Sequence, residues 1–305
     1  RTASWLKRVP LIFDAHELFP ELPEVVGRRW VRALWTKTED LIFPHLRHAY
    51  TVCHSIADYY FRRYGLRMGV VRNIPPRRMQ DFSEKVPPLR ARSAAAFPEK
   101  GRMKILLYQG AVNVGRGLEW IIDAMPLLDD CMLYVCGDGD CLQALRRRAE
   151  ASPAARRIVF TGRIPHACLA AYTARADIGF VLLERLGLSY YYALPNRIFD
   201  YMRSGVPVVA TDFPEIRRIV QESGSGVLTS RHDPAHLARL IRTLLAEWTP
   251  EKHQALRRKA EDYCWENEAR TMLATVARAL GRQRQEAPAP PLPIAAEASR
   301  TRITP

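Results

Sequence analysis

The sequence has no run of about 18 apolar residues, the length that a helix needs to cross a bilayer. Hydrophobic residues nevertheless make up 48% of its 305 positions, which is enough to bury a sizeable core. The opening residues do not read as a secretory signal, no internal repeat is visible, and the first residue is Arg1 rather than Met. The opening residues read as the middle of a domain, so we expect two domains and further residues upstream.

Cysteine is sparse, and its spacing excludes the common zinc motifs. Three of the six cysteines, Cys131, Cys136 and Cys141, recur every five residues. Structural zinc sites instead separate paired cysteines by about two to four residues. Cys131 and Cys136 flank a predicted strand, where buried thiols are common. We therefore predict free thiols in a reducing cytoplasm and no metal site.

Acidic residues are in the minority, and the formal net charge is +14. The basic surplus is 10 in positions 1–105 and 4 in positions 106–305. Such a surface attracts nucleic acid, anionic lipid or anionic small molecules, although an arginine-rich solvated surface has the same composition. No recognised nucleic-acid-binding motif is present, so we expect no nucleic-acid partner.

From residue 103 onward, strand-like apolar runs and helical patterns alternate six times within about 145 residues. This alternation predicts a doubly wound α/β domain with a parallel sheet over residues 103–248. Ligands of such sheets bind at the carboxyl ends of the strands, so the residues after each strand are the candidates for a site. The predicted strands lie within 103–110, 131–139, 156–162, 177–184, 206–210 and 224–229.

The rest of the chain divides by composition. Residues 1–80 contain three strand-like runs, in "VPLIFDAHE", "AYTVCHS" and "GVVRNIP", and predict a similar but incomplete domain. The Pro- and Gly-containing residues 81–102 predict a linker. The pattern of residues 249–282 predicts C-terminal helices that cross back to the first domain. Residues 283–305 are rich in proline and alanine, and this composition predicts a disordered tail.

The loop "QGAVNVGRGLEW" follows the first strand of the second domain. Gly110, Gly115 and Gly117 would let backbone amides approach a ligand closely. Arg116 stands at the start of the next helix, where a guanidinium and a helix N-terminus together suit a diphosphate. Taken alone, the loop favours an ordinary surface arginine. "CGDGD" follows the second strand and includes Gly137, but Leu142 replaces the last glycine of a dinucleotide fingerprint, so a tight turn is favoured over an NAD site.

The stretch "LPNRIFDYM" predicts a helix that begins near Pro195 and Asn196 and carries Asp200 in its second turn. Asp200 could pair with Arg197 or Arg203 on the helix surface. It could instead accept hydrogen bonds from ribose hydroxyls, as acidic residues do in other nucleotide sites. The residues alone favour the ion pair.

Several stretches together resemble the family 4 glycosyltransferases of the GT-B architecture, in which two Rossmann-like α/β domains face each other across a cleft. The resemblance runs from about residue 10 to residue 265 and implies that the N-terminal domain is incomplete. It is carried by "FDAHELFPE", "VVRNIP", "YQGAVNVGRGLEWIIDAM", "VCGDGD", "FTGRIPH" and "LPNRIFDYMRSGVPVVATDFPEI".

The resemblance implies roles for these residues. Asp200 stands where the family has the second glutamate of an E-x7-E motif, which holds the donor ribose. Arg116 replaces the family's lysine at the donor diphosphate, and His16 matches a histidine that faces the donor sugar. These two are the predicted catalytic residues. For His16, the residues alone favour a strand-end histidine that is hydrogen-bonded to Asp14 or Glu17. The remaining donor-binding candidates are Gly110, Gly115, Gly117, Gly137, Gly162, Arg163, Ile164, Leu194, Pro195 and Asn196, with Gly162, Arg163 and Ile164 framing the base.

There are three departures from the family pattern. Tyr192 stands at the first glutamate of the motif, and Ala111 replaces one diphosphate arginine. The family's glycine-rich loop after its first strand has no counterpart. Relatives with an "LPNK-FEYM" block share the first departure, so Tyr192 is not evidence of inactivity. The missing loop and Ala111 leave open a non-catalytic, nucleotide-sugar-binding relative.

The resemblance implies transfer of a sugar from a nucleoside diphosphate sugar to a glycan or lipid-linked acceptor, with retention of configuration and without a metal or another cofactor. A sugar-nucleotide epimerase of similar fold is an alternative. A place in cell-envelope polysaccharide synthesis follows, in the cytoplasm or at the inner face of the membrane. An apolar stripe with near-helical spacing lies among basic residues, which fits a membrane-surface helix. It consists of Trp30, Val31, Leu34, Trp35, Leu41 and Ile42. A helix packed on the first domain's sheet would show the same stripe, and we favour that interpretation.

Overall fold

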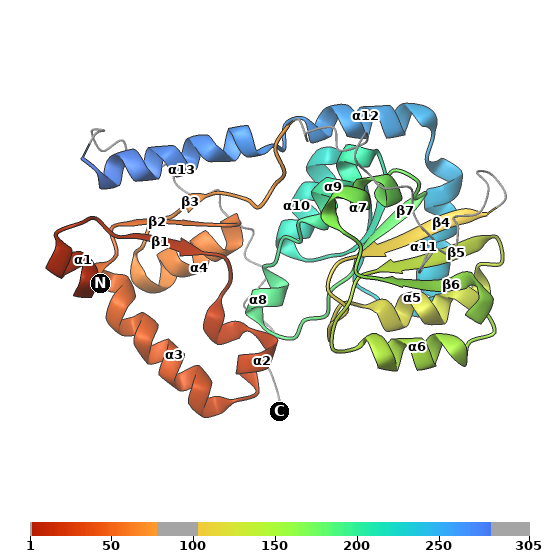
Figure 1. Cartoon of the computed structure of the whole chain (residues 1–305), viewed down its shortest axis with the longest axis horizontal. Coiled ribbons are helices and arrows are strands. Elements are labelled where there is room, and N and C mark those ends of the chain that lie inside the picture. The colour runs from red at the N-terminus through yellow and green to blue at the C-terminus, as the bar shows by residue number, and fades with distance from the viewer. Residues whose placement is uncertain (1, 78–102, 282–305) are drawn as a thin grey trace.

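The computed structural model describes residues 2–77 and 103–281, which form two α/β lobes side by side (Figure 1). The N-terminal lobe contains residues 2–77, and residues 103–264 form the C-terminal lobe. The predicted linker 81–102 and tail 283–305 lie outside the described residues.

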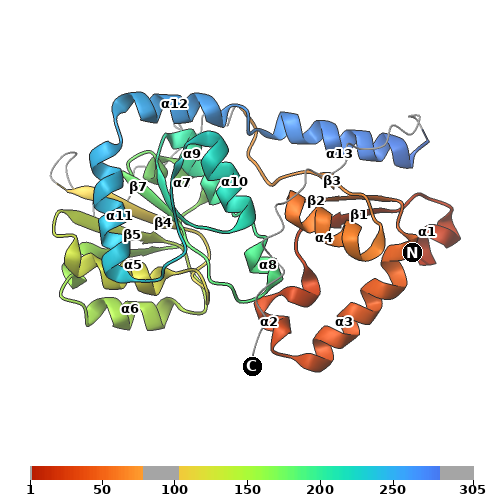
Figure 2. The same ribbon diagram turned by 180° about the vertical axis from the view of Figure 1, so that it is seen from behind.

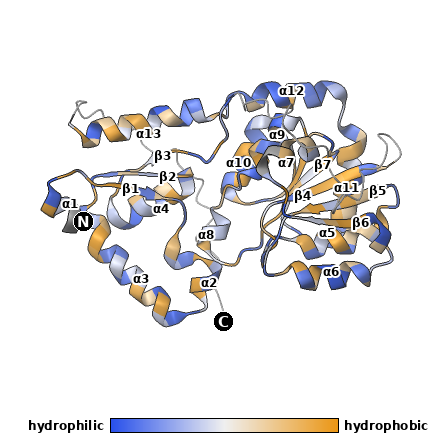
Figure 3. Ribbon diagram, in the orientation of Figure 1, coloured by the Kyte–Doolittle hydropathy of each residue, from blue (hydrophilic) through white to orange (hydrophobic). Residues whose placement is uncertain are grey.

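The C-terminal lobe is built on one sheet of six parallel strands in the order β6-β5-β4-β7-β8-β9. This doubly wound order confirms the α/β fold predicted from the sequence. Helices cover both faces of the central strands, and the sequences of these strands are therefore almost continuously apolar. They are coloured orange, for hydrophobic residues, in Figure 3. The strands are β4 Lys104–Gln109, β5 Cys131–Cys136, β6 Ile158–Gly162, β7 Ile178–Val181, β8 Val208–Thr211 and β9 Gly226–Thr229.

Helices cover both faces of this sheet, and each face has its own apolar core. On one face lie α5 Leu118–Ala124, α6 Leu142–Glu150 and α11 Pro234–Glu247. On the other lie α7 His166–Thr173, α9 Arg197–Ser204, α10 Pro214–Ser223 and α12 Pro250–Ala260. Helix α9 buries Ile198, Phe199 and Met202 against the strands. Each such side chain contributes about 1.5–3 kcal/mol relative to an exposed one.

The start of α11 follows directly from local chemistry. The Asp233 carboxylate accepts hydrogen bonds from the amides of Ala235 and His236, and Pro234 occupies the first turn. An acidic N-cap satisfies amides that have no partner inside the helix, and proline at the first position loses no helical hydrogen bond.

The N-terminal lobe has a parallel sheet of three strands, in the order β1-β2-β3, as the sequence predicts. Its core gathers around Leu18, Phe43, Ile56 and Tyr60, which are all buried. The elements are α1 Thr2–Lys7, β1 Ile12–Ala15, η1 Phe19–Glu21, α2 Pro23–Val26, α3 Arg29–Ile42, η2 Phe43–His45, β2 His48–Thr51, α4 His54–Tyr64 and β3 Gly69–Val70.

Helix α13, Trp265–Ala279, brings the chain back to the N-terminal lobe and runs beside the sheet of that lobe (Figure 2). The preceding helix α12 packs on the C-terminal lobe. The Glu268 carboxylate, only 4% exposed, accepts hydrogen bonds from the amide, Nε and Nη2 of Arg72 at 2.7–3.0 Å. A second contact joins the lobes directly. The Glu215 carboxylate of α10 accepts hydrogen bonds from the amide and hydroxyl of Ser55, at the start of α4, at 2.7 and 2.6 Å.

Helix α3 is oriented differently from our expectation. Trp30, Leu34 and Leu41 are 90%, 65% and 72% exposed, so the favoured interpretation, that this stripe packs on the sheet, is wrong for these three residues. Trp35 packs edge-on against Phe19 with ring centroids 4.5 Å apart. The spacing of an apolar stripe does not reveal which side of a helix faces the protein.

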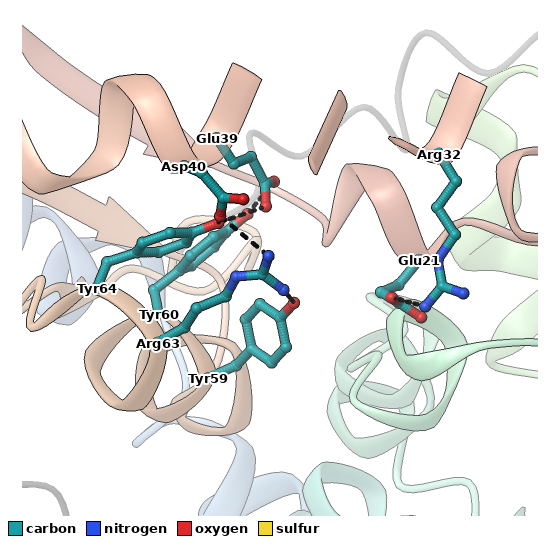
Figure 4. A network of polar contacts seen from close by, with 8 residues as sticks. All are labelled: Glu21, Arg32, Glu39, Asp40, Tyr59, Tyr60, Arg63 and Tyr64. Atoms are coloured by element: carbon teal, nitrogen blue, oxygen red, sulfur yellow. Dashed lines mark hydrogen bonds and ion pairs between the residues drawn. The ribbon is translucent and has the colours of Figure 1, made fainter. Parts of the chain in front are cut away.

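The protein-facing side of α3 buries a carboxylate instead. Glu39 is 6% exposed and accepts hydrogen bonds from the hydroxyls of Tyr60 and Tyr64 (Figure 4). Burial raises the pKa of Glu39 to about 7. The neighbouring Asp40 is exposed, and hydrogen bonds from Tyr64 and Arg63 lower its pKa.

We expect Glu39→Gln to raise the melting temperature at pH 8 and to leave it nearly unchanged at pH 5. Glu39 is protonated in the folded state at low pH, and its contribution to stability is lost as the pH rises through about 7, where the buried group ionises. Glutamine mimics the protonated form. Differential scanning calorimetry between pH 5 and 8 measures this.

Asp40→Asn is the matched control. The pKa of Asp40 is lowered, so its effect on stability changes with pH in the opposite direction to that of Glu39. The variant's loss of stability should be largest near neutral pH and should vanish in acid. Parallel pH profiles for the two variants would contradict the assignment of the titrating group to Glu39.

Candidate functional site

The candidate site lies at the carboxyl end of β4, where the sheet order reverses. Strand β4 pairs with β5 on one side and with β7 on the other. The loops that follow β4 and β7 therefore diverge, and a crevice for ligands opens between such loops. A backbone hydrogen bond joins the two loops, because the Glu184 amide donates to the Gly115 carbonyl at 2.9 Å. A pocket of about 690 Å³ lies elsewhere, between α1 and residues 45–48.

Arg116 lies in the loop after β4 and is held by an aromatic ring. Its guanidinium carbon is 4.7 Å from the centre of the Tyr190 ring. Among the described residues, its buried Nε has no hydrogen-bond partner. Burial raises the pKa of Tyr190, and the Arg116 cation opposes this shift.

The three glycines of this loop make close approaches possible. Gly115 and Gly117 have φ angles of +76° and +67°, in the left-handed region that side chains disfavour. A Cβ on Gly115 would come within 2.5 Å of Leu186 Cδ1, and one on Gly110 would come within 3.3 Å of Arg197 Nη1. The loop glycines therefore accommodate neighbouring side chains of this protein.

Asp200 is positioned by the last residue of β4. Helix α9 begins at Arg197, so Asp200 lies in the first turn and not in the second as we predicted. Its Oδ2 accepts a hydrogen bond from Gln109 Nε2 at 3.0 Å, and Gln109 Oε1 accepts one from the Thr173 hydroxyl at 2.7 Å. The Thr173 bond fixes the orientation of the amide. Asp200 itself is partly exposed at the carboxyl edge of the sheet.

The two arginines beside Asp200 have structural contacts of their own. Arg197 is 9% exposed, donates to the Gln109 carbonyl at 3.0 Å and stacks on Tyr108 at 4.6 Å. Arg203 donates to the Pro75 carbonyl at 3.1 Å and so reaches the N-terminal lobe. Each therefore ties α9 to another part of the molecule.

The segment before α9 lies between the lobes. Asn196 occupies the N-cap position with helical backbone angles, and its side chain makes no capping bond. The Pro195 carbonyl accepts from the Ile198 amide at 3.1 Å, and Leu194 packs against the cores of both lobes. The Tyr192 carbonyl accepts a hydrogen bond from the Cys53 thiol of the N-terminal lobe at 3.2 Å.

His16 follows β1 directly, at the carboxyl end of the other sheet. Asn73 Nδ2 donates to its Nδ1 at 3.2 Å, so Nε2 carries the proton and donates to Asp14 at 3.1 Å. The side chain remains 54% exposed. Cys53 and Ser55, which follow β2, both contact the C-terminal lobe, so the carboxyl ends of β1 and β2 face that lobe.

The predicted base-contacting residues lie farther along the sheet. Gly162 ends β6 with a φ of +71° and open space around it. Arg163 is exposed, whereas Ile164 packs against the core. Strand β6 is two strands away from β4, which corresponds to about 10 Å.

Gly137 belongs to a turn that packs on the protein itself. A Cβ there would overlap the Gly110 carbonyl oxygen, and the Gly110 amide donates to the Cys136 carbonyl at 3.0 Å. The turns after β4 and β5 are therefore interlocked. The same turn holds Asp138 and Asp140, whose Asp-x-Asp spacing the prediction of metal independence overlooked.

Within residues 2–77 and 103–281, no three His, Cys, Asp or Glu side chains gather as a metal site would require. The Asp138 carboxylate accepts a hydrogen bond from the Gly139 amide at 2.8 Å.

We expect Gly137→Ala to reduce the free energy of unfolding by more than about 3 kcal/mol, because an added methyl group would overlap a backbone oxygen in the interlocked turns. Gly162→Ala is the control and should cost only about 1–2 kcal/mol, since it strains the backbone but meets open space. Urea unfolding measures both. A Gly137→Ala loss no larger than that of Gly162→Ala would contradict the tight packing.

Sequence reasoning did not single out Gln109, Tyr190 or the buried role of Arg197. A signal existed for Gln109, because it is the polar residue that ends the apolar run "KILLYQ" at the carboxyl edge. No comparable signal marked Tyr190, because the short helix α8, Leu188–Tyr191, is defined by contacts between the lobes.

Residues 103–247 match the family described as "Glycosyl transferases group 1". Among curated proteins, the chain is 29% identical over 164 residues to a phosphatidyl-myo-inositol mannosyltransferase of Mycobacterium leprae, covering 50% of this chain and 39% of that protein. It is 28% identical over 182 residues to a GDP-mannose-dependent alpha-(1-6)-phosphatidylinositol dimannoside mannosyltransferase of Mycobacterium tuberculosis, covering 56% and 43%. The chain thus spans about two fifths of the length of these relatives.

Solved structures with the same fold cover nearly all of the chain. Sucrose-phosphate synthase from Thermosynechococcus elongatus has a TM-score of 0.66 at 19% identity, covering 92% of this chain and 72% of that one. HepE from Anabaena, in complex with UDP-glucose, has a TM-score of 0.65 at 15% identity, covering 92% and 74%. At these identities the likeness shows the fold alone, which is the GT-B arrangement of two α/β lobes.

Proposed function

Residues 103–247 belong to the group 1 glycosyltransferases, and on that premise we propose that the protein transfers a sugar from a nucleoside diphosphate sugar to a glycan or lipid-linked acceptor. The proposal includes retention of configuration and metal-independent transfer. The observation that carries it is the placement of a cation, Arg116, and an oriented carboxylate, Asp200, at the carboxyl edge of one sheet.

The donor's parts can be assigned to this edge by distance and chemistry. Asp200, fixed by Gln109, would accept hydrogen bonds from the ribose hydroxyls. Arg116 would bind the diphosphate and stabilise the charge that develops as it leaves. The base would lie toward Gly162, about 10 Å along the sheet, which suits the length of a nucleoside.

The sugar would face the N-terminal lobe. His16 directly follows a strand whose carboxyl end faces the C-terminal lobe, and its side chain is partly exposed. In this proposal His16 contacts the donor sugar. Group transfer needs water to be excluded, and two lobes closing on the donor would supply that.

Relatives and neighbours support the substrate class without deciding the base. One curated relative is named GDP-mannose-dependent, and the HepE structure is a complex with UDP-glucose. The curated relatives named above also act on phosphatidylinositol compounds, according to their names, which supports a lipid-linked acceptor and a role in the cell envelope.

We expect one nucleotide class in a panel of UDP-, GDP-, ADP- and dTDP-sugars to raise the melting temperature of the chain. A ligand at about 100 times its Kd adds roughly 2.7 kcal/mol to stability. Asp200→Ala and Arg116→Ala should each reduce the shift strongly, because each removes one proposed donor contact and leaves the others. Thermal-shift measurement with each sugar nucleotide identifies the base.

Lys252→Ala is a suitable control, since this exposed residue lies on α12, away from the carboxyl edge, and should keep the shift. Equal shifts in the wild type, Asp200→Ala and Arg116→Ala would reject the site. Product analysis distinguishes the proposed glycosyltransferase from its two alternatives. Conversion of the sugar nucleotide in the absence of an acceptor indicates an epimerase. Binding without any turnover indicates a non-catalytic relative.

The proposal also includes a cytoplasmic location with peripheral contact at the inner face of the membrane, made by α3. No helix in the described ranges is long and apolar enough to span a bilayer. Trp30, Leu34, Lys37 and Leu41 are spaced i, i+4, i+7 and i+11, so they form one exposed stripe. Exposed basic residues, including Arg29, adjoin it, and this composition fits anionic lipid.

We expect a Trp30→Ser/Leu34→Ser/Leu41→Ser variant to bind vesicles containing anionic phosphatidylglycerol at least about tenfold more weakly than the wild type. Burial of each of these side chains contributes about 1.5–3 kcal/mol, so the loss of three should be large. Cosedimentation at two salt concentrations measures the binding. Leu273→Ser, at another exposed apolar position on α13, should bind normally. If the wild-type protein does not cosediment with the vesicles at low salt, the proposed membrane contact is wrong.

A further inference from the structure

In the part of the chain that the structure describes, Arg116 is held in place by an aromatic ring and not by a carboxylate. Its guanidinium lies over Tyr190 at 4.7 Å, and its buried Nε has no hydrogen-bond partner among the described residues. Gly115 leaves room for this packing, because a Cβ at that position would be 3.3 Å from Tyr190 Cε2. The side chain is therefore confined by shape while its polar atoms remain available.

This kind of contact has a specific chemical consequence. An acidic partner would neutralise the guanidinium and occupy its N–H groups. An aromatic ring attracts the cation by about 0.5–2 kcal/mol and leaves both the charge and the N–H groups for an anion. A buried N–H without a partner is unfavourable, so an incoming phosphate oxygen gains from satisfying it.

Tyr190 is itself fixed by contacts with both lobes. It is 8% exposed and lies in α8. A Cβ on Gly187, which precedes α8, would come within 2.5 Å of the Glu21 carbonyl oxygen in the N-terminal lobe. Leu188 and Tyr192 pack against the core of that lobe. The ring under Arg116 is thus placed by a segment clamped between the two halves of the protein.

We propose that Tyr190 is a positioning residue, which holds the Arg116 guanidinium in place for the donor diphosphate. This inference rests on the proposed function, since the diphosphate belongs to the proposed donor. Tyr190 acts through Arg116, so removing its ring should have no effect once the guanidinium is absent.

The test compares Tyr190→Leu with Tyr190→Phe, which keeps the ring, by isothermal titration calorimetry. With the sugar nucleotide that stabilises the wild type, we expect Tyr190→Leu to bind about 5- to 30-fold more weakly, as a loss of one to two kcal/mol implies. Tyr190→Phe should stay within about twofold of the wild type. The corresponding nucleoside without phosphates should bind all three proteins equally, because it lacks the group that Arg116 contacts.

A double-mutant cycle separates positioning from general destabilisation. Tyr190→Leu/Arg116→Ala should bind the sugar nucleotide no more weakly than Arg116→Ala alone. Tyr191→Leu is the matched control, since Tyr191 is in the same helix and its ring lies 4.5 Å from a different guanidinium, that of Arg185. Additive losses in the double variant, or wild-type affinity in Tyr190→Leu, would overturn the inference.

A second measurement does not depend on the donor. Modification of Arg116 by phenylglyoxal, followed by peptide mass spectrometry, should be faster in Tyr190→Leu than in the wild type and Tyr190→Phe, because the ring no longer covers the guanidinium. Unchanged reactivity in Tyr190→Leu would also overturn the inference. If no sugar nucleotide binds the wild type while Arg116 becomes reactive as expected, the proposed function fails and the packing role of Tyr190 stands.

Discussion

The arrangement of the candidate site depends on the hydrogen bonds of Gln109, the last residue of the central strand β4. Its carbonyl accepts from Arg197, its side-chain nitrogen donates to Asp200, and its side-chain oxygen accepts from Thr173. One residue thus ties α9 and α7 to the sheet and orients a carboxylate at the sheet's edge. Because Gln109 and Arg197 are buried, these bonds form where competing water is scarce, so the geometry is well defined.

The fold of the C-terminal lobe was largely predictable, since its signals are local. Strands β4, β7 and β8 are buried on both faces and therefore show continuous apolar runs, and Asp233 followed by proline marks the start of α11. The pairing of strands into one doubly wound sheet follows from their alternation with helices. These features need no knowledge of distant residues.

The features that escaped prediction are all set by distant contacts. The pattern of α3 gives the spacing of its apolar stripe but not the side that faces the protein, and here the buried side carries Glu39. The helix α8 depends on packing between the lobes, so nothing local marked Tyr190. Arg197 resembled a surface ion-pair partner because its true acceptor, a carbonyl oxygen at the end of β4, is 88 residues away in the sequence.

The return of the chain through α13 has a consequence for biosynthesis. Arg72 and its partner Glu268 are separated by 196 residues. At ribosomal rates of about 5–20 residues per second, the nascent chain spends on the order of 10–40 seconds with the N-terminal sheet still lacking this helix. During that interval the sheet face that α13 covers is open to solvent. The N-terminal lobe, although made first, is therefore completed last.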